Sequence, residues 1–170
     1  MNLSFEVDDN GMAYTYVNDV KGTLNYFDTS NLIKEIQGKE GIYLETGSYL
    51  GCSAIMAALV SNVTVYAHDI WSDHVLDDGS TVPPPKPEDD YFKIFYNNVK
   101  SNKLQGRVIP IRGVSKYTVN AIHDNETVDI AFVDGDHSED GIYGDLIAVY
   151  PKLKKDGVLL CHDCTRGSVT

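Results

Sequence analysis

Apolar and polar positions fall into blocks from residue 41 onward, where short apolar runs of strand length are separated by segments with helical periodicity. The apolar runs predict strands at residues 42–46, 63–69, 107–113, 128–134 and 157–163. The intervening segments predict helices at residues 52–60, 89–102, 115–125 and 138–157, the last two capped by Ser115 and Ser138. The strands are apolar throughout rather than at every second position, which is typical of a parallel sheet covered by helices on both faces. The sequence therefore predicts an α/β fold with a doubly wound, mostly parallel sheet.

The first 40 residues do not follow this alternation. Two β-rich runs, LSFEV and MAYTYV, flank Asn10-Gly11, and Asn-Gly is a strong signal for a hairpin turn. A capped helix is predicted after them, from about Ser30 to Gln37. We therefore expect an N-terminal hairpin and helix extension over residues 1–40, attached to an α/β core over residues 41–170 in a single domain.

The segment 72–88 interrupts the alternation a second time, because it holds four of the six prolines and follows the second predicted strand. Loops at the carboxyl edge of a parallel sheet border the ligand site. A lid or substrate wall and an ordinary surface loop are equally compatible with this composition.

Composition and charge narrow the function classes. The 170 residues have a formal net charge of −11, which repels a phosphate backbone and disfavours non-specific nucleic-acid binding. No apolar run approaches the roughly 20 residues of a membrane span. Three cysteines without a disulfide-framework spacing suit a reducing compartment. These observations predict a cytoplasmic protein without nucleic-acid or membrane partners.

A glycine turn separates the first core strand from its helix, in the pattern Glu45-x-Gly47-x-x-x-Gly51. Glycines there let the backbone approach a ligand closely, and the helix N-terminus then faces that ligand. A dinucleotide site would carry the three glycines of G-x-G-x-x-G to cradle a pyrophosphate. Here two glycines follow a carboxylate, which repels phosphate and suits a ligand with hydroxyls and a positive charge. The competing interpretation is a tight strand–helix packing turn that binds nothing.

A second acidic residue also favours a nucleoside ligand. Asp69 ends the next predicted strand, 24 residues after Glu45, where a carboxylate accepts hydrogen bonds from both ribose hydroxyls. Ile70 and Trp71 follow it and are apolar groups suited to flank an adenine. A nucleoside without phosphates that bears a positive charge corresponds to S-adenosylmethionine.

Four motifs occur in the order expected of one enzyme family: LETGSYLGCSA, VYAHDIW, VIPIRGVS and VDIAFVDGDHSEDGIYGDLIAVYPKLKKDGVLLCHD. Together they resemble class I S-adenosylmethionine-dependent methyltransferases, which have a Rossmann-like fold. The similarity is greatest to the small-molecule O-methyltransferase branch, whose fourth strand ends in D-G-D-H-S. The resemblance covers residues 41–164.

This resemblance implies which residues bind the cofactor. The methionine and ribose portions would lie on Glu45, Gly47, Ser48, Tyr49 and Gly51, and Asp69 would hold the ribose. Gly113, Val114 and Ser115 would border the adenine, although relatives often have an acid where Val114 stands. Asp134 is a further candidate cofactor contact.

A second group of polar residues ends the fourth and fifth predicted strands, which are neighbours in this fold. Asp134, His162 and Asp163 offer carboxylate and imidazole ligands for Mg²⁺ or Mn²⁺, and imidazole favours Mn²⁺. His137 lies three residues after Asp134, where the resemblance implies a base that removes a hydroxyl proton. In the competing interpretation Asp134 contacts only the cofactor and His162 is a buried core histidine.

The sequence departs from the family pattern after the fifth predicted strand. Relatives continue with a helix and an antiparallel strand pair, whereas CHDCTRGSVT follows within a few residues here. We therefore expect the C-terminal strand pair to be missing from this chain. An unpaired edge of an apolar strand favours pairing with another chain, so a homo-oligomer is predicted.

The leading hypothesis is an S-adenosylmethionine-dependent methyltransferase that acts on a hydroxyl group of a small metabolite, with possible help from a divalent metal. One alternative is a metal-dependent nucleotide-sugar glycosyltransferase, because D-G-D is a D-x-D motif of the kind that holds a metal-bound diphosphate. Another is a truncated, non-catalytic domain that binds a nucleoside.

Overall fold

A five-stranded parallel sheet forms the centre of the computed structural model, which describes residues 1–71 and 90–162. The strands lie in the order β6-β5-β4-β7-β8, and every neighbouring pair is parallel. Their bounds are Glu40–Thr46 for β4, Asn62–Asp69 for β5, Val108–Arg112 for β6, Val128–Val133 for β7 and Leu153–Cys161 for β8. The predicted doubly wound α/β fold is therefore confirmed.

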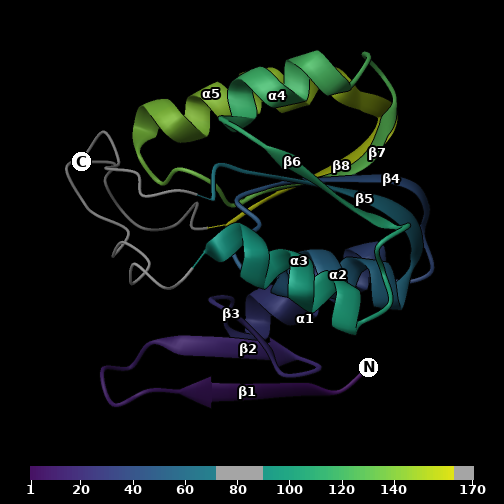
Figure 1. Cartoon of the computed structure of the whole chain (residues 1–170). Coiled ribbons are helices and arrows are strands. Elements are labelled where there is room, and N and C mark those ends of the chain that lie inside the picture. Colours follow the sequence, from purple (N-terminus) through teal and green to yellow (C-terminus); the bar gives the residue numbers. More distant parts are fainter. Residues whose placement is uncertain (72–89, 163–170) are drawn as a thin grey trace.

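Helices cover both faces of this sheet (Figure 1). On one face lie α1 (Tyr26–Ile36), α2 (Cys52–Val60) and α3 (Tyr91–Ser101), and on the other lie α4 (Ser115–Ile122) and α5 (Glu139–Val149). Adjacent residues of β4 show why its sequence is apolar throughout, since Tyr43 and Leu44 are both fully buried but belong to separate core clusters. Over residues 1–71 and 90–162, no helix has the length and apolar character that crossing a membrane requires.

The strand order determines where a ligand can bind. β4 is the first strand of the sheet in sequence but lies in its middle, with β5 on one side and β7 on the other. The chain therefore leaves β4 and β7 toward opposite halves of the sheet, and in open parallel sheets ligands bind at such a reversal, outside the carboxyl ends of the strands. The glycine turn follows β4 at this edge.

The N-terminal segment forms a small antiparallel sheet of β1 (Leu3–Val7), β2 (Ala13–Val17) and β3 (Val20–Gly22). The β1–β2 hairpin is as predicted, with Gly11 at a φ of 80°. The third strand was not predicted. It follows a two-residue turn in which Asn18 and Asp19 both have positive φ, 47° and 68°, as hairpin turns that match the twist of the strands require.

Two predicted helix boundaries and one predicted strand boundary are wrong. The first helix begins at Tyr26 rather than near Ser30, because the Asn25 side chain caps it by accepting hydrogen bonds from the backbone of Phe27 and Asp28. The last helix ends at Val149, and a 3-10 turn over Tyr150–Lys152 contains Pro151, which cannot continue an α-helix. The chain enters β8 directly after that turn, four residues before the predicted start of the strand.

β8 pairs only with β7 within the described residues and so forms one edge of the sheet. Beside it, the exposed side chains of Tyr143, Ile147 and Tyr150 line an apolar hollow together with Leu159. The homo-oligomer remains a prediction, since one chain alone does not test it.

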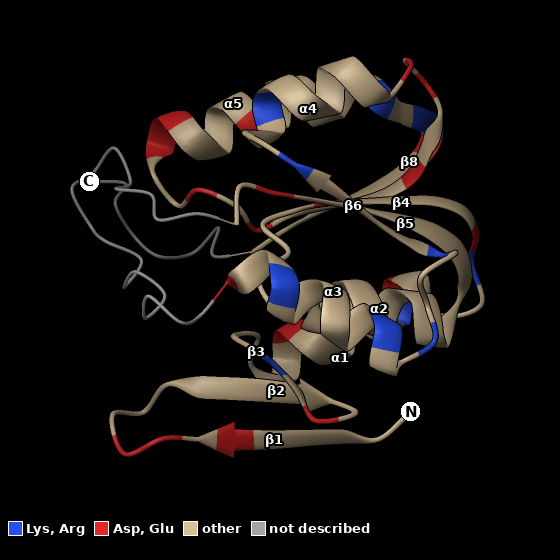
Figure 2. Ribbon diagram, in the orientation of Figure 1, with Lys and Arg blue, Asp and Glu red and all other residues tan. Residues whose placement is uncertain are grey.

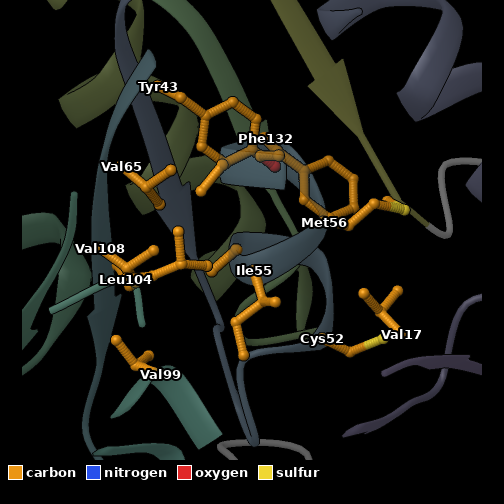
Figure 3. Packing of buried hydrophobic residues seen from close by; sticks show 14 of the residues in the cluster. Val17, Tyr43, Cys52, Ile55, Met56, Val65, Val99, Leu104, Val108 and Phe132 are labelled. Atoms are coloured by element: carbon orange, nitrogen blue, oxygen red, sulfur yellow. The ribbon is translucent and has the colours of Figure 1, made fainter. Parts of the chain in front are cut away.

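The N-terminal segment packs into the main core. Val17 of β2 and Ile36 of α1 are fully buried in the same cluster as Tyr43, and Figure 3 shows Val17 beside Cys52 of α2. Burial raises the pKa of the Cys52 thiol to about 12, so this cysteine acts as an apolar packing group. The extension is therefore continuous with the hydrophobic core of the sheet.

Replacing Ile36 by alanine tests that continuity. We expect Ile36→Ala to lower the free energy of unfolding by about 2–5 kcal/mol, because it opens a cavity in the shared core. Urea unfolding followed by circular dichroism measures the change, and Phe27→Ala is the control because Phe27 is 75% exposed on the same helix. A separate early transition in Ile36→Ala, with the main transition unmoved, would show that the extension folds independently.

Candidate active site

The turn between β4 and α2 is built on two glycines that adopt positive φ angles. Gly47 has a φ of 81°, and a Cβ atom there would lie 1.9 Å from the carbonyl oxygen of Asp134. Gly51 has a φ of 90°, and its Cβ would lie 2.9 Å from the Phe95 ring. Both glycines are therefore required by packing alone. The competing interpretation of a tight strand–helix packing turn is therefore correct for the backbone of this segment.

Asp69 ties this turn to the end of β5. Its Oδ2 accepts a hydrogen bond from the backbone N–H of Tyr49 at 2.8 Å, and its Oδ1 accepts one from the backbone N–H of Trp71 at 2.7 Å. The Trp71 indole Nε1 then donates to the Tyr49 carbonyl at 2.7 Å. Burial raises the pKa of the Asp69 carboxyl, although these backbone donors oppose the shift. The carboxylate predicted to hold the ribose thus also organises the backbone around it.

The residues predicted to surround an adenine occupy different environments. The Trp71 ring is only 4% exposed and packs against Phe92 and Phe95, with ring centroids 5.1 and 4.7 Å away, so it is part of the core. Ile70 is half-buried. On the neighbouring strand, Gly113 donates its N–H to the Asp69 carbonyl at 2.9 Å, which brings the start of α4 close to β5.

Ser115 does not cap α4 as predicted. Val114, 40% exposed, occupies the N-cap position, and no side chain caps the helix. The Ser115 hydroxyl instead donates to Asp145 Oδ1 on α5 at 2.5 Å. Asp145 is buried, and burial raises the pKa of its carboxyl. The hydroxyl donates to Asp145 rather than capping the helix because a buried carboxylate without a hydrogen-bond donor costs more free energy than an uncapped helix end that is exposed to water.

Glu45 lies below the turn, fully buried on the same face of β4 as Tyr43. The Tyr43 hydroxyl donates to its Oε2 at 3.0 Å, and Ser48 and Ser53 lie close enough to hydrogen-bond to it. Burial raises the pKa of the Glu45 carboxyl to about 7 against the opposing effect of these hydroxyls. Its predicted contact with a cofactor is not tested. In this structure Ser48 and Ser53 stand between Glu45 and the nearby cavity.

That cavity has a volume of about 20 Å³, enough for a water molecule but far too small for a nucleoside. Lys21, Gly22, Thr23 and Leu24 of the N-terminal segment line one side, and the glycine turn with Asp134 lines the other. Neither Glu45 nor Asp69, the two carboxylates predicted to contact the cofactor, lines this cavity.

Asp134, His137 and His162 gather at the carboxyl ends of β7 and β8. Each offers one ligand atom, and these atoms lie within 4.8 Å of one another. Asp134 Oδ1 is 2.8 Å from His162 Nδ1 and 3.4 Å from His137 Nε2. Burial would raise the pKa of Asp134, but its contacts with His137 and His162 outweigh that effect and lower it. The structure thus brings the predicted base together with two predicted ligands, while Asp163 lies outside the described residues.

Sequence reasoning missed a fourth member of this group. Asp28, in the first turn of α1, has its Oδ2 3.2 Å from His162 Nε2. In the sequence Asp28 is an acidic residue near a helix N-terminus, and acidic residues are common there because the helix dipole stabilises negative charge. No local signal connects it with a histidine 134 residues away.

Two other polar side chains at this edge of the sheet accept hydrogen bonds from the backbone. Asp136 Oδ1 accepts a hydrogen bond from the Ser138 N–H at 2.8 Å, and Ser138 Oγ accepts one from Gly141 at 3.0 Å. The predicted Ser138 cap of α5 is therefore confirmed. Glu139 and Asp140 lie in the first turn of that helix, which begins with a red segment in Figure 2, and the positive end of the helix dipole favours them there.

The family profile of a methyltransferase domain matches residues 44–164, which include the glycine turn, Asp69 and the Asp134–His162 cluster. The chain belongs to this methyltransferase domain family. The predicted methyltransferase is thereby confirmed at the level of the family, and the glycosyltransferase alternative is dropped. No curated protein matches the chain.

Solved structures with the same fold include three methyltransferases. A precorrin-6Y C5,15-methyltransferase from Geobacter metallireducens has a TM-score of 0.60 and 17% identity over 91% of this chain and 69% of its own. A SAM-dependent methyltransferase from Thiobacillus denitrificans, solved with S-adenosyl-L-homocysteine, has a TM-score of 0.57 and 13% identity over 81% and 48%. A protein from Methanococcus maripaludis described as an S-adenosyl-L-methionine-dependent methyltransferase has a TM-score of 0.55 and 19% identity over 78% and 52%.

At these identities the likeness concerns the fold of the methyltransferase domain. The chain spans about half the length of the Thiobacillus and Methanococcus structures. The shared fold agrees with the sheet order and with the position of the glycine turn at its carboxyl edge.

The buried Glu45 makes the stability of this domain depend on pH. Its pKa is raised from 4.5 to about 7 in the folded state, so the folded protein binds more protons than the unfolded chain between these values and its stability falls as the pH rises through them. Glu45→Gln removes this loss, which is on the order of 3 kcal/mol by pH 8. Urea unfolding at pH 5 and pH 8 measures the difference, with Glu40→Gln as the control because Glu40 is exposed on the same strand. An identical pH dependence in Glu45→Gln and the unmodified protein would show that Glu45 keeps its charge when buried.

Proposed function

We propose that the protein transfers a methyl group from S-adenosylmethionine to a hydroxyl group of a small metabolite, assisted by a divalent metal ion. The observation that carries this proposal is the position of the Asp134–His137–His162 cluster beside the glycine turn. The Gly47 backbone lies against the Asp134 carbonyl, so a cofactor at the turn and an acceptor at the cluster would be adjacent. Membership of the methyltransferase domain family supports the reaction class.

The cofactor would lie over the glycine turn and the end of β5. The Asp69 carboxylate accepts a backbone hydrogen bond from Tyr49 on one oxygen and from Trp71 on the other, and its remaining lone pairs would accept the ribose hydroxyls. Ser48 and Ser53 offer hydroxyl groups to the methionine end, and the Glu45 carboxyl lies buried beneath them. Bound S-adenosylmethionine supplies the methyl group as a sulfonium, which is electrophilic and favoured by nearby negative charge.

The residues of the cluster fit a divalent ion. Adjacent ligands of an octahedral ion with bonds of roughly 2.1 Å lie about 3.0 Å apart, and Asp134 Oδ1 is 2.8 and 3.4 Å from the two imidazole nitrogens. One carboxylate with imidazole favours Mn²⁺ over Mg²⁺. Asp134 and His162 would hold the ion, and a bound ion would lower the pKa of an acceptor hydroxyl.

His137 is the residue we assign to proton removal. Its side chain is 46% exposed, in contrast to 10% for His162, so it is the imidazole of the cluster that an acceptor can reach. Its Nε2 lies 3.4 Å from Asp134, and that carboxylate stabilises the positive charge that the ring gains with the proton.

The cofactor assignment predicts a specific loss of affinity. Asp69→Asn should weaken S-adenosylhomocysteine binding roughly ten- to hundredfold, because hydrogen bonds to a charged acceptor are worth about 1.5–3 kcal/mol each. Isothermal titration calorimetry measures this affinity. Asp129→Asn is the matched control, since Asp129 also accepts a backbone N–H, from Ile42 at 2.8 Å, but on the opposite edge of the sheet. Equal affinity in both variants, or none in the unmodified protein, would remove the cofactor assignment.

The division of roles within the cluster gives a second prediction. His137→Ala should slow methyl transfer about 10²- to 10⁴-fold while Mn²⁺ affinity stays within about threefold of the unmodified protein. His162→Ala should weaken Mn²⁺ binding by more than about tenfold. Release of S-adenosylhomocysteine over a panel of catechols, sugars and other hydroxylated compounds measures the rate, and calorimetry with Mn²⁺ measures the affinity. If His137→Ala loses Mn²⁺ as His162→Ala does, His137 is a ligand rather than the base.

A further inference from the structure

Asp145 is a buried carboxylate in the middle of α5, on the helix face that packs into the core. Its side chain belongs to a residue that is only 3% exposed, and the other buried residues of this helix are Ala148 and Val149. Burying a carboxylate costs free energy even when donors surround it. An apolar residue would pack at this position without that cost, so the neighbours of Asp145 have to account for its presence.

Three segments of the chain meet at the Asp145 carboxyl group. Its Oδ1 accepts the Ser115 hydroxyl, at the start of α4, at 2.5 Å. A Cβ atom on Gly135 would lie 2.8 Å from its Oδ2, so the backbone that follows β7 packs directly against the carboxyl group. Thr46, the last residue of β4, lies close enough to hydrogen-bond to it, and the Thr46 Oγ1 would be 3.5 Å from the same Cβ atom. One side chain of α5 thus contacts the connections that leave three different strands.

Each of these contacts adjoins a residue predicted to bind the cofactor or the metal ion. Thr46 directly precedes the glycine turn, Gly135 directly follows Asp134, and Ser115 is one of the residues predicted to border the adenine. The backbone N–H of Asp134 also donates to the Thr46 carbonyl at 3.0 Å, which links two of the segments through the main chain. Ser115 is linked to both through the Asp145 carboxyl group.

We propose that Asp145 is a positioning residue that holds the start of α4, the glycine turn and the Asp134 segment in one fixed arrangement. Asp145 does not line the cavity at the glycine turn, so it acts through Ser115, Thr46 and Gly135 rather than on a ligand. Binding groups have to be held within about 0.5 Å of their productive geometry by the residues beneath them. This inference rests on the cofactor site of the proposed function, but the arrangement itself can be measured without a ligand.

Amide hydrogen exchange of the full chain, followed by NMR, measures the arrangement. The N–H groups of Gly47, Asp134 and Gly113 donate to backbone carbonyls at 2.9, 3.0 and 2.9 Å, so their exchange reports on the three segments. Asp145→Ala should speed this exchange roughly ten- to hundredfold, because the segments open locally once the carboxyl group is gone. Val149→Ala is the matched control: Val149 is fully buried on the same helix, but its core cluster includes none of the three segments.

Calorimetry with S-adenosylhomocysteine gives the functional measurement, at a temperature where circular dichroism shows each variant to be folded. Asp145→Ala should weaken binding about tenfold or more. Asp145→Asn should recover much of this loss, because the amide oxygen still accepts the Ser115 hydroxyl and the amide nitrogen can donate to Thr46. Val149→Ala should bind with unchanged affinity, since a residue that only stabilises the fold does not alter the affinity of the folded protein.

Ser115→Ala tests whether Asp145 acts through its hydrogen-bond partner. On its own this substitution should weaken binding and speed exchange at Gly113. Added to Asp145→Ala, it should change the affinity by less than about threefold, because residues that act through one contact are not additive. Where Asp145→Ala does not fold, Ser115→Ala takes its place, and an unchanged exchange rate at Gly113 then counts against the proposal.

The outcomes separate this inference from the proposed function. If exchange at the three amides rises no more in Asp145→Ala than in Val149→Ala, the positioning role of Asp145 is overturned, whether or not S-adenosylhomocysteine binds. Equal affinity of Asp145→Ala and the unmodified protein also counts against it. If the unmodified protein binds no S-adenosylhomocysteine but the exchange depends on Asp145 as expected, the fixed arrangement stands and the cofactor assignment fails.

Discussion

The Asp69 carboxylate is the interaction on which the site depends. Two backbone N–H groups that lie outside the helices and strands, from Tyr49 and Trp71, donate to it. This arrangement joins the turn after β4 to the end of β5, and Gly47 then lies against the Asp134 carbonyl at the end of β7. Three strand ends are thereby held together at one edge of the sheet, where a strand order that reverses at β4 leaves room for a ligand.

Burying charge at this edge has a cost, and the structure shows how it is limited. Glu45, Asp69 and Asp145 all have pKa values raised by burial, and each is surrounded by hydroxyl or backbone donors that oppose the shift. Asp134 differs, because two histidines lower its pKa despite burial. A group of buried carboxylates around one turn is expensive for folding, and such groups are concentrated at functional sites.

Much of the core could be predicted from the sequence because its signals are local. The five strands begin or end within a few residues of the predicted positions, since each is a continuous apolar run bounded by polar residues. The helix over 138–157 was predicted too long because the apolar spacing continues through Leu153, although Pro151 ends the helical hydrogen bonding. The Ser115 cap was wrong because a partner on another helix, Asp145, competes for the same hydroxyl. Trp71 was predicted to flank an adenine, but its ring packs against two phenylalanines of α3 in the core.

The sequence by itself determined the class of fold, the order of the elements and the presence of Asp134, His137 and His162 at neighbouring strand ends, because periodicity and chain order suffice for these. Only the tertiary structure decided that Asp28 reaches His162, that Glu45 lies beneath the turn and that the N-terminal segment lines the cavity. Contacts of this kind join residues far apart in the chain, and they depend on how layers pack rather than on any local pattern. Side-chain spacing along one element carries no information about which other element will cover it.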